Sequence, residues 1–102
     1  MIDVVQQHRD ELATLCRQYD VERMDLFGSA AAARFDALTS DLDFLVIFRR
    51  DSAQDPANRY FGLLADMEGL LGRHVDLVDL RACRNPYFVA EALKHREMLY
   101  AA

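Results

Sequence analysis

The sequence predicts an α/β (α+β) fold, in which helices flank a small mixed sheet of about three to four strands. Helix-like and strand-like segments alternate along the chain, beginning and ending with a helix. The chain has 102 residues, of which 52% are hydrophobic and 28% are charged. This length and composition predict a single domain over residues 1–102 and argue against a disordered or repeat protein.

The first half of the chain contributes two of the predicted strands. Apolar residues at near-helical spacing predict an amphipathic helix over residues 2–19. Val21–Phe27 carries branched and aromatic residues and predicts a strand that ends in a turn. An alanine run predicts a short helix over 30–33, followed by a loop over 35–40. The continuous apolar run 44–48 predicts a strand that is buried on both faces.

The second half of the chain repeats the alternation. A helix is expected over 55–72, because an aspartate–proline pair caps its start and a glycine ends it. Alternating apolar residues over 74–80 predict a third strand. An asparagine–proline pair at 85–86 predicts a last helix that reaches about Tyr100.

Charge and sequence context narrow the class of partner. The chain has 12 basic and 17 acidic residues, a net charge of −5, so it would repel the phosphates of duplex DNA, and no direct nucleic-acid binding is expected. No signal peptide is recognisable, and no apolar run approaches the ~20 residues of a membrane span. We therefore expect a cytoplasmic protein with no membrane association. Cys16 and Cys83 are expected as buried free thiols, with a disulfide between them as the alternative.

Three sequence features combine into one candidate site. Gly28 and Ser29 follow the first predicted strand and precede a helix, where free N–H groups and the serine hydroxyl can bind a phosphate. Asp41 and Asp43 lie two residues apart at the start of the next strand, so their carboxylates point to the same face. Asp76 would join them if the third strand lies beside the second.

Three carboxylates this close together would repel one another strongly unless a cation lay between them. Oxygen-only ligands suit Mg²⁺, so Asp41, Asp43 and Asp76 are the predicted metal ligands. The phosphates of a bound nucleotide would complete the coordination of two Mg²⁺ ions.

This pattern resembles the polymerase-beta-like nucleotidyltransferase superfamily, most closely its minimal nucleotidyltransferase (MNT) branch. The resemblance rests on Gly28-Ser29, eleven intervening residues, Asp41 and Asp43, and Asp76 further on, and it extends over nearly the whole chain. It implies the polymerase-beta palm fold, with nucleotide bound by the Gly-Ser turn and the three aspartates as catalytic metal ligands. By the same resemblance, Asp76 also assists deprotonation of the acceptor hydroxyl.

The resemblance also implies a substrate and a partner. Prokaryotic members of the MNT branch are commonly paired with a HEPN-domain toxin and transfer AMP from ATP to a tyrosine hydroxyl of that toxin. The expected function is therefore that of an antitoxin enzyme, with ATP as substrate and two Mg²⁺ ions as cofactors. Transfer to a small molecule is disfavoured, because such enzymes usually need a second domain to enclose the acceptor.

One departure from the family pattern supports an alternative function. The family usually reads Gly-Ser-x-Ala-Arg-Gly across the turn, whereas this chain has Ala32 and Ala33 in place of the arginine and the second glycine. The nearest basic residue is Arg34. The alternative is an antitoxin with weakened catalysis that neutralises the toxin by stoichiometric binding.

Several individual residues have more than one interpretation. Asp76 on its own can be a solvated strand residue or the partner of Arg73, and Asp79 is expected on the opposite strand face, at the surface. The three histidines form no ligand pair. A basic cluster is most simply a solvated face, or else it meets an acidic partner; its members are Arg81, Arg84, Lys94 and Arg96.

The last predicted helix carries more apolar residues than one stripe needs. It is either buried between the sheet and the first helix, or exposed to dock a protein partner or a second copy of the chain. The residues concerned are Phe88, Val89, Leu93, Met98, Leu99 and Tyr100.

Overall fold

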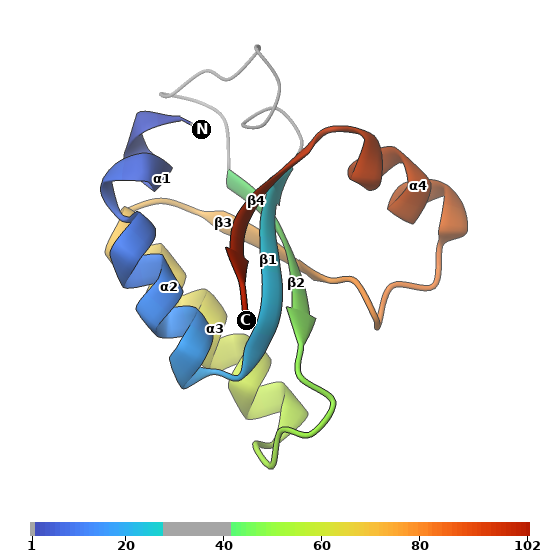
Figure 1. The fold of residues 1–102 in the computed structure, drawn as a ribbon, viewed down its shortest axis with the longest axis horizontal. Helices are drawn as coiled ribbons and strands as arrows, with labels where there is room; N and C mark the ends of the chain where they lie inside the picture. The colour runs from blue at the N-terminus through green and yellow to red at the C-terminus, as the bar shows by residue number, and fades with distance from the viewer. Residues whose placement is uncertain (1, 28–41) are drawn as a thin grey trace.

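A four-stranded mixed sheet forms the centre of the molecule, as the computed structural model shows for the described residues, 2–27 and 42–102 (Figure 1). The strands are β1 (Val21–Phe27), β2 (Leu42–Phe48), β3 (Val75–Asp79) and β4 (Arg96–Ala101), in the order β3-β2-β1-β4. β1 is antiparallel to both β2 and β4, whereas β2 and β3 are parallel. The predicted mixed sheet flanked by helices is confirmed.

The first predicted helix is divided into two. α1 (Asp3–Gln7) and α2 (Arg9–Gln18) meet at His8, whose φ of −108° and ψ of 15° interrupt the helical backbone. The buried side chains of the pair, Val5, Leu12 and Cys16, all join the main core, so the predicted amphipathic pattern holds across the break.

The helix after β2 begins and ends where the sequence predicts. α3 (Pro56–Leu71) is capped by Asp55, whose carboxylate accepts a hydrogen bond of 3.0 Å from the backbone N–H of Asn58. Gly72 ends the helix with a positive φ of 67°, a left-handed conformation that glycine adopts without steric cost.

The prediction that the last helix continues to Tyr100 is wrong. Asn85 does cap α4 (Pro86–Lys94), but the helix ends there, and β4 pairs with the free edge of β1. Helix propensity along Glu97-Met98-Leu99 favours continuation, whereas the backbone N–H and C=O groups at the edge of β1 gain partners only from a strand. This non-local pairing prevails. The predicted short helix at 30–33 and the loop at 35–40 lie outside the described residues.

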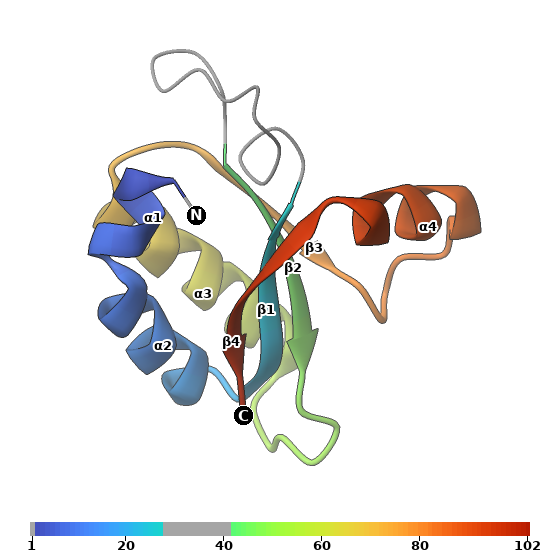
Figure 2. The ribbon, with the colours of Figure 1, turned by 45° about the horizontal axis from the view of Figure 1, so that its top comes forward.

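Two apolar layers pack against the two faces of the sheet. The larger one lies between the sheet and helices α2 and α3, and includes Met24, Leu26, Phe44, Val46, Leu63 and Met67. The smaller one contains Phe27, Leu45 and Ala92 of α4, which extends from the sheet on the side away from the other helices (Figure 2). Neighbouring residues of β2 thus enter both layers, which confirms the strand buried on both faces.

The side-chain environment of the cysteines agrees with free thiols. Cys16 is buried and Cys83 is half-buried, and neither forms a disulfide. Desolvation raises the pKa of Cys16 to about 12, so this thiol stays protonated at neutral pH.

In the described part of the chain, no helix is long and apolar enough to span a membrane.

Candidate active site

A single row of residues crosses the sheet at the edge where β2 and β3 begin. Asp43 of β2 is in register with Asp76 of β3 on one side and with Phe27 of β1 on the other. Phe27 is in turn in register with Arg96 of β4. Directly opposed residues point to the same face of a sheet. Because Phe27 packs against Ala92, this is the face on which α4 lies.

The structure therefore brings together two of the three predicted metal ligands. Asp43 is half-buried, and the Asp76 side chain is 53% exposed. The condition set for Asp76, that the third strand lies beside the second, is met by their parallel pairing. The third predicted ligand, Asp41, and the predicted phosphate-binding residues Gly28 and Ser29 lie outside the described residues.

A pocket of ≈ 420 Å³ adjoins the two carboxylates. Asp43 and Asp76 line it together with Phe27 and with Phe88 of α4. The two phenylalanine rings meet edge to face, with centroids 6.1 Å apart, so α4 contributes a wall of the pocket. A substrate bound here would contact both carboxylates and an aromatic surface.

The chemistry of the two carboxylates fits a hard divalent cation. Adjacent strands lie about 4.8 Å apart, so two like charges directly opposite one another destabilise the sheet unless another charge offsets them. Carboxylate oxygens are the donors that Mg²⁺ prefers. Among residues 2–27 and 42–102, no group of three acidic, histidine or cysteine side chains could hold a metal. The described residues thus supply two of the three predicted ligands.

A histidine links Asp76 to a second carboxylate. His74 Nε2 lies 3.2 Å from Asp76 Oδ1, and His74 Nδ1 lies 3.1 Å from Glu68 Oε2. The same Glu68 oxygen accepts a hydrogen bond of 3.0 Å from the backbone N–H of Val75. Glu68, on α3, therefore positions His74, which in turn contacts one oxygen of Asp76.

This arrangement was not predicted from the sequence. The alternatives for Asp76 were a solvated strand residue and a partner of Arg73, whereas the structure places His74 Nε2 at 3.2 Å from that carboxylate. The available signal was the spacing, because residues two apart on an extended strand share a face. Glu68 gave no signal, since it comes from a helix that folds back along β3.

Tyr60 also reaches this edge of the sheet. Its hydroxyl donates a hydrogen bond to the carbonyl of Leu77, and its side chain lines the same pocket. Burial raises the pKa of Tyr60, and the charges of Asp79 and Asp76 raise it further. The phenol therefore stays protonated at neutral pH and holds α3 against β3.

A buried carboxylate lies on the same face, one pleat away from the row. Asp25 is 2% exposed and accepts three hydrogen bonds of 3.0–3.2 Å from the Nε and Nη2 atoms of Arg23. Arg96 Nη1 lies 3.7 Å from Asp25 Oδ2. Two guanidinium groups therefore compensate the buried charge and tie β4 to β1.

The basic cluster predicted near the C-terminus does not form one face. Arg96 turns to Asp25, and Lys94 pairs with Glu91 on α4 at 3.2 Å. Arg81 instead reaches the opposite end of the sheet, where it contacts Glu22 at 3.1 Å. These three side chains therefore pair with different carboxylates in different parts of the molecule.

The last helix is not buried between the sheet and the first helix, which was one of the two alternatives for it. α4 lies away from α2, and Ala92 is its buried residue in the described structure. Large apolar side chains remain exposed on α4 and the adjacent strand: Tyr87 at 86%, Phe88 at 38%, Leu93 at 37% and Met98 at 49%. We call these four residues the exposed α4 surface.

The family of the chain follows from its match to a family model. Residues 10–102 match the family model described as polymerase beta, nucleotidyltransferase, and the chain belongs to this family. The superfamily resemblance seen in the sequence is thereby confirmed. No curated protein matches the chain closely enough to count as a relative.

Several solved structures have a fold similar to that of this chain. The solved structure of a candidate minimal nucleotidyltransferase is 28% identical in sequence, with a TM-score of 0.77, and the match covers 94% of this chain and 95% of that chain. A toxin-antitoxin structure with AMP-PNP is 22% identical, with a TM-score of 0.72 over 92% of this chain and 73% of the other. A chain in the complex of tri-AMPylated Shewanella oneidensis HEPN toxin with MNT antitoxin is 21% identical, with a TM-score of 0.68. That match covers 95% of this chain and 72% of the other.

Proposed function

We propose that this chain, acting as a single domain over residues 1–102, is an antitoxin that transfers AMP from ATP to a tyrosine hydroxyl of a HEPN-domain toxin. The observation that carries the proposal is the cross-strand pair of Asp43 and Asp76 beside a pocket, in a member of the nucleotidyltransferase family. The tri-AMPylated toxin in complex with a similarly folded MNT antitoxin supports the choice of acceptor. We expect this reaction in the cytoplasm.

Each site residue has an assigned role in the proposal. Asp41, Asp43 and Asp76 hold Mg²⁺, and Gly28 and Ser29 bind the phosphates of ATP. When bound, Mg²⁺ would neutralise charge on the phosphates and favour ionisation of the acceptor hydroxyl.

The proposed reaction forms one bond and breaks one. The tyrosine oxygen attacks the α-phosphorus of ATP, and the bond from that phosphorus to the oxygen bridging to the β-phosphate breaks. Pyrophosphate leaves, and AMP remains on the tyrosine. Asp76 accepts the proton of the attacking hydroxyl, and the Phe27 and Phe88 rings form an apolar wall beside the two carboxylates.

Replacement of Asp76 tests the proposed function. We expect Asp76→Asn to lower the rate of AMP transfer to the toxin by about 100-fold. The amide carries no negative charge, so it stabilises neither the bound Mg²⁺ nor the loss of the proton from the acceptor hydroxyl. The rate is measured with labelled ATP and purified toxin. Asp10→Asn, on the exposed start of α2, is the matched control and should transfer at the wild-type rate. Equal rates for wild type and Asp76→Asn would contradict the assignment.

The link through His74 gives a second prediction. We expect His74→Ala to lower kcat about tenfold at an unchanged KM for ATP, because Asp76 then loses the contact that orients its Oδ1 oxygen. His74→Gln retains a hydrogen-bond donor and should restore most of the rate. A rise in KM without a fall in kcat, or no rescue by glutamine, would show that His74 does not position Asp76.

The exposed α4 surface favours the alternative function, neutralisation by binding. Exposed aromatic and aliphatic side chains of this size are typical of interface centres. Phe88 belongs both to this surface and to the wall of the pocket. A toxin bound there would therefore lie next to Asp43 and Asp76, so the same surface serves stoichiometric binding and delivery of a tyrosine.

Binding through this surface is testable without catalysis. We expect Tyr87→Ser to weaken association with the toxin about tenfold in the absence of ATP, because an 86% exposed ring contributes nothing to the core and is free to enter an interface. Calorimetry measures the affinity. Phe61→Ser removes a 64% exposed ring from α3 and should leave the affinity unchanged. Wild-type affinity of Tyr87→Ser would place the interface elsewhere, and equal weakening by both variants would show that the effect is not specific to this surface.

A further inference from the structure

A second pocket lies at the opposite end of the sheet from Asp43 and Asp76. Its volume is ≈ 310 Å³, and it is formed where the parallel strands β2 and β3 end. Four arginines line it, Arg49, Arg50, Arg59 and Arg81, against one carboxylate, that of Asp79. One third of the 12 basic residues of a chain with a net charge of −5 thus face one cavity.

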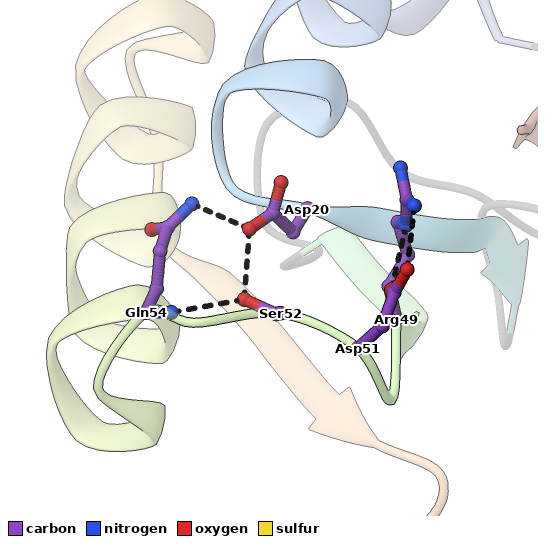
Figure 3. Close-up of polar contacts among 5 residues, drawn as sticks. All are labelled: Asp20, Arg49, Asp51, Ser52 and Gln54. Carbon is purple, nitrogen blue, oxygen red and sulfur yellow. Dashed lines mark hydrogen bonds and ion pairs between the residues drawn. The ribbon is translucent and has the colours of Figure 1, made fainter.

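Two of these arginines already have carboxylate partners. Arg49 donates from Nε and Nη2 to Asp51 at 3.0 and 2.9 Å (Figure 3). Arg81 pairs with Glu22 at 3.1 Å and also donates to the carbonyl of Phe48. These two guanidinium groups are largely compensated.

The other two arginines have no carboxylate partner among the described residues. The Arg59 guanidinium lies 4.4 Å from the centroid of the Phe48 ring, and its Nε atom is buried without a hydrogen-bond acceptor in the described structure. Arg50 is exposed at the pocket and makes no ion pair with the described part of the chain. Arg50 and Arg59 therefore leave the positive charge of two guanidinium groups at the pocket without a carboxylate to balance it.

The single carboxylate that lines the pocket does not neutralise these arginines. Asp79 Oδ1 accepts hydrogen bonds from the backbone N–H groups of Arg81 and Ala82, at 3.1 and 3.4 Å. Asp79 is half-buried, and these bonds engage it in the turn after β3, whereas the sequence predicted a surface residue. The N-terminus of α3 adds no free anion site, because Asp55 already caps it.

The loop that carries Arg49 and Arg50 is held in place by its own polar contacts. Ser52 donates its hydroxyl to Asp20 at 2.8 Å and accepts from the backbone N–H of Gln54 at 3.2 Å (Figure 3). The Gln54 side chain donates to the same Asp20 oxygen at 2.9 Å. The pocket wall is therefore formed before any ligand binds, which reduces the entropic cost of binding.

We propose that this pocket binds a phosphate group, with Arg50 and Arg59 as its principal ligands. A guanidinium group presents several N–H donors in a planar fork that matches phosphate oxygens. Two unpaired guanidinium groups balance the charge of a phosphate dianion. Inorganic phosphate and the phosphate of a mononucleotide share this chemistry. The site is separate from the proposed AMP-transfer site and does not depend on it.

Arginine Nε–H resonances in ¹H,¹⁵N NMR spectra report on this site directly. We expect inorganic phosphate, added to the full chain without divalent cations, to shift the Arg59 Nε–H resonance saturably. Chloride at the same ionic strength should not. AMP is the second arm: tighter binding than phosphate would identify a nucleotide ligand, and equal binding would identify phosphate alone. A phosphate response that never saturates, or one that chloride reproduces, would overturn the proposal.

Substitutions separate this site from the active site. We expect Arg59→Gln and Arg50→Gln each to weaken phosphate binding about tenfold, as loss of a charge-assisted hydrogen bond predicts. Arg50 is exposed, so its substitution leaves the fold intact even if Arg59→Gln disturbs the packing on Phe48. Arg9→Gln, an exposed charge on α2, and Asp43→Asn should both bind phosphate as wild type does. If Arg9→Gln weakens phosphate binding as much as Arg50→Gln does, the effect comes from the net charge of the chain and not from this pocket, and the proposal is overturned.

Discussion

Replacing Asp43 by asparagine is expected to lower AMP transfer about 1,000-fold while leaving the fold intact. Asp43 is half-buried in the middle of the row that crosses the sheet, between Phe27 and Asp76. Water can occupy the place of the more exposed Asp76 carboxylate more readily than that of Asp43. The expected loss is therefore larger than the about 100-fold loss for Asp76→Asn.

The same variant has a readout that needs no toxin. A ligand that binds the folded state raises the melting temperature, so Mg²⁺ with a non-hydrolysable ATP analogue should stabilise the wild-type chain. Asp43→Asn should lose most of that stabilisation. Circular dichroism of the variant, unchanged from wild type, controls for the fold. If Mg²⁺ and the analogue raise the melting temperature of Asp43→Asn as much as that of wild type, Asp43 is not a metal ligand.

Replacing Arg23 by methionine is expected to lower the free energy of unfolding by about 3 kcal/mol, because it leaves a buried carboxylate without its main partner. Asp25 is 2% exposed and would lose all three hydrogen bonds from Arg23. Arg96 remains, but at 3.7 Å it is a weaker partner. Urea unfolding at neutral pH measures the change.

The control for this prediction removes both charges. In Arg23→Met combined with Asp25→Leu, no carboxylate remains buried at this site, and the new leucine lies on the face that already carries Leu45 and Phe27. The double variant should be more stable than the single one by about 2 kcal/mol. If the single variant unfolds like wild type, the buried Asp25 carboxylate does not depend on Arg23 for its compensation.

The sequence was sufficient to predict the parts of the fold that depend on local pattern and simple strand order. The capping pairs at 55–56 and 85–86 correctly predicted the starts of α3 and α4. The apolar run in β2 predicted a doubly buried strand. The position of β3 beside β2 was left as a condition, and the pairing of Asp43 with Asp76 follows once that condition is met.

The features that sequence analysis missed depend on contacts between distant segments. β4 forms because β1 offers an unpaired edge, which no local signal around residue 97 reveals. The contact of Glu68 with His74 joins α3 to the start of β3. The arginine pocket likewise draws on the end of β2, the following loop, α3 and the turn after β3.

The proposed modification of a HEPN toxin depends on the carboxylates at the start of β2 and β3. Intact-mass spectrometry of the toxin, co-expressed with either wild type or Asp43→Asn, tests this dependence. We expect whole AMP units on the toxin with wild type and an unmodified toxin with Asp43→Asn. An unmodified toxin that binds equally to both chains would overturn the proposed reaction and leave neutralisation by binding as the function.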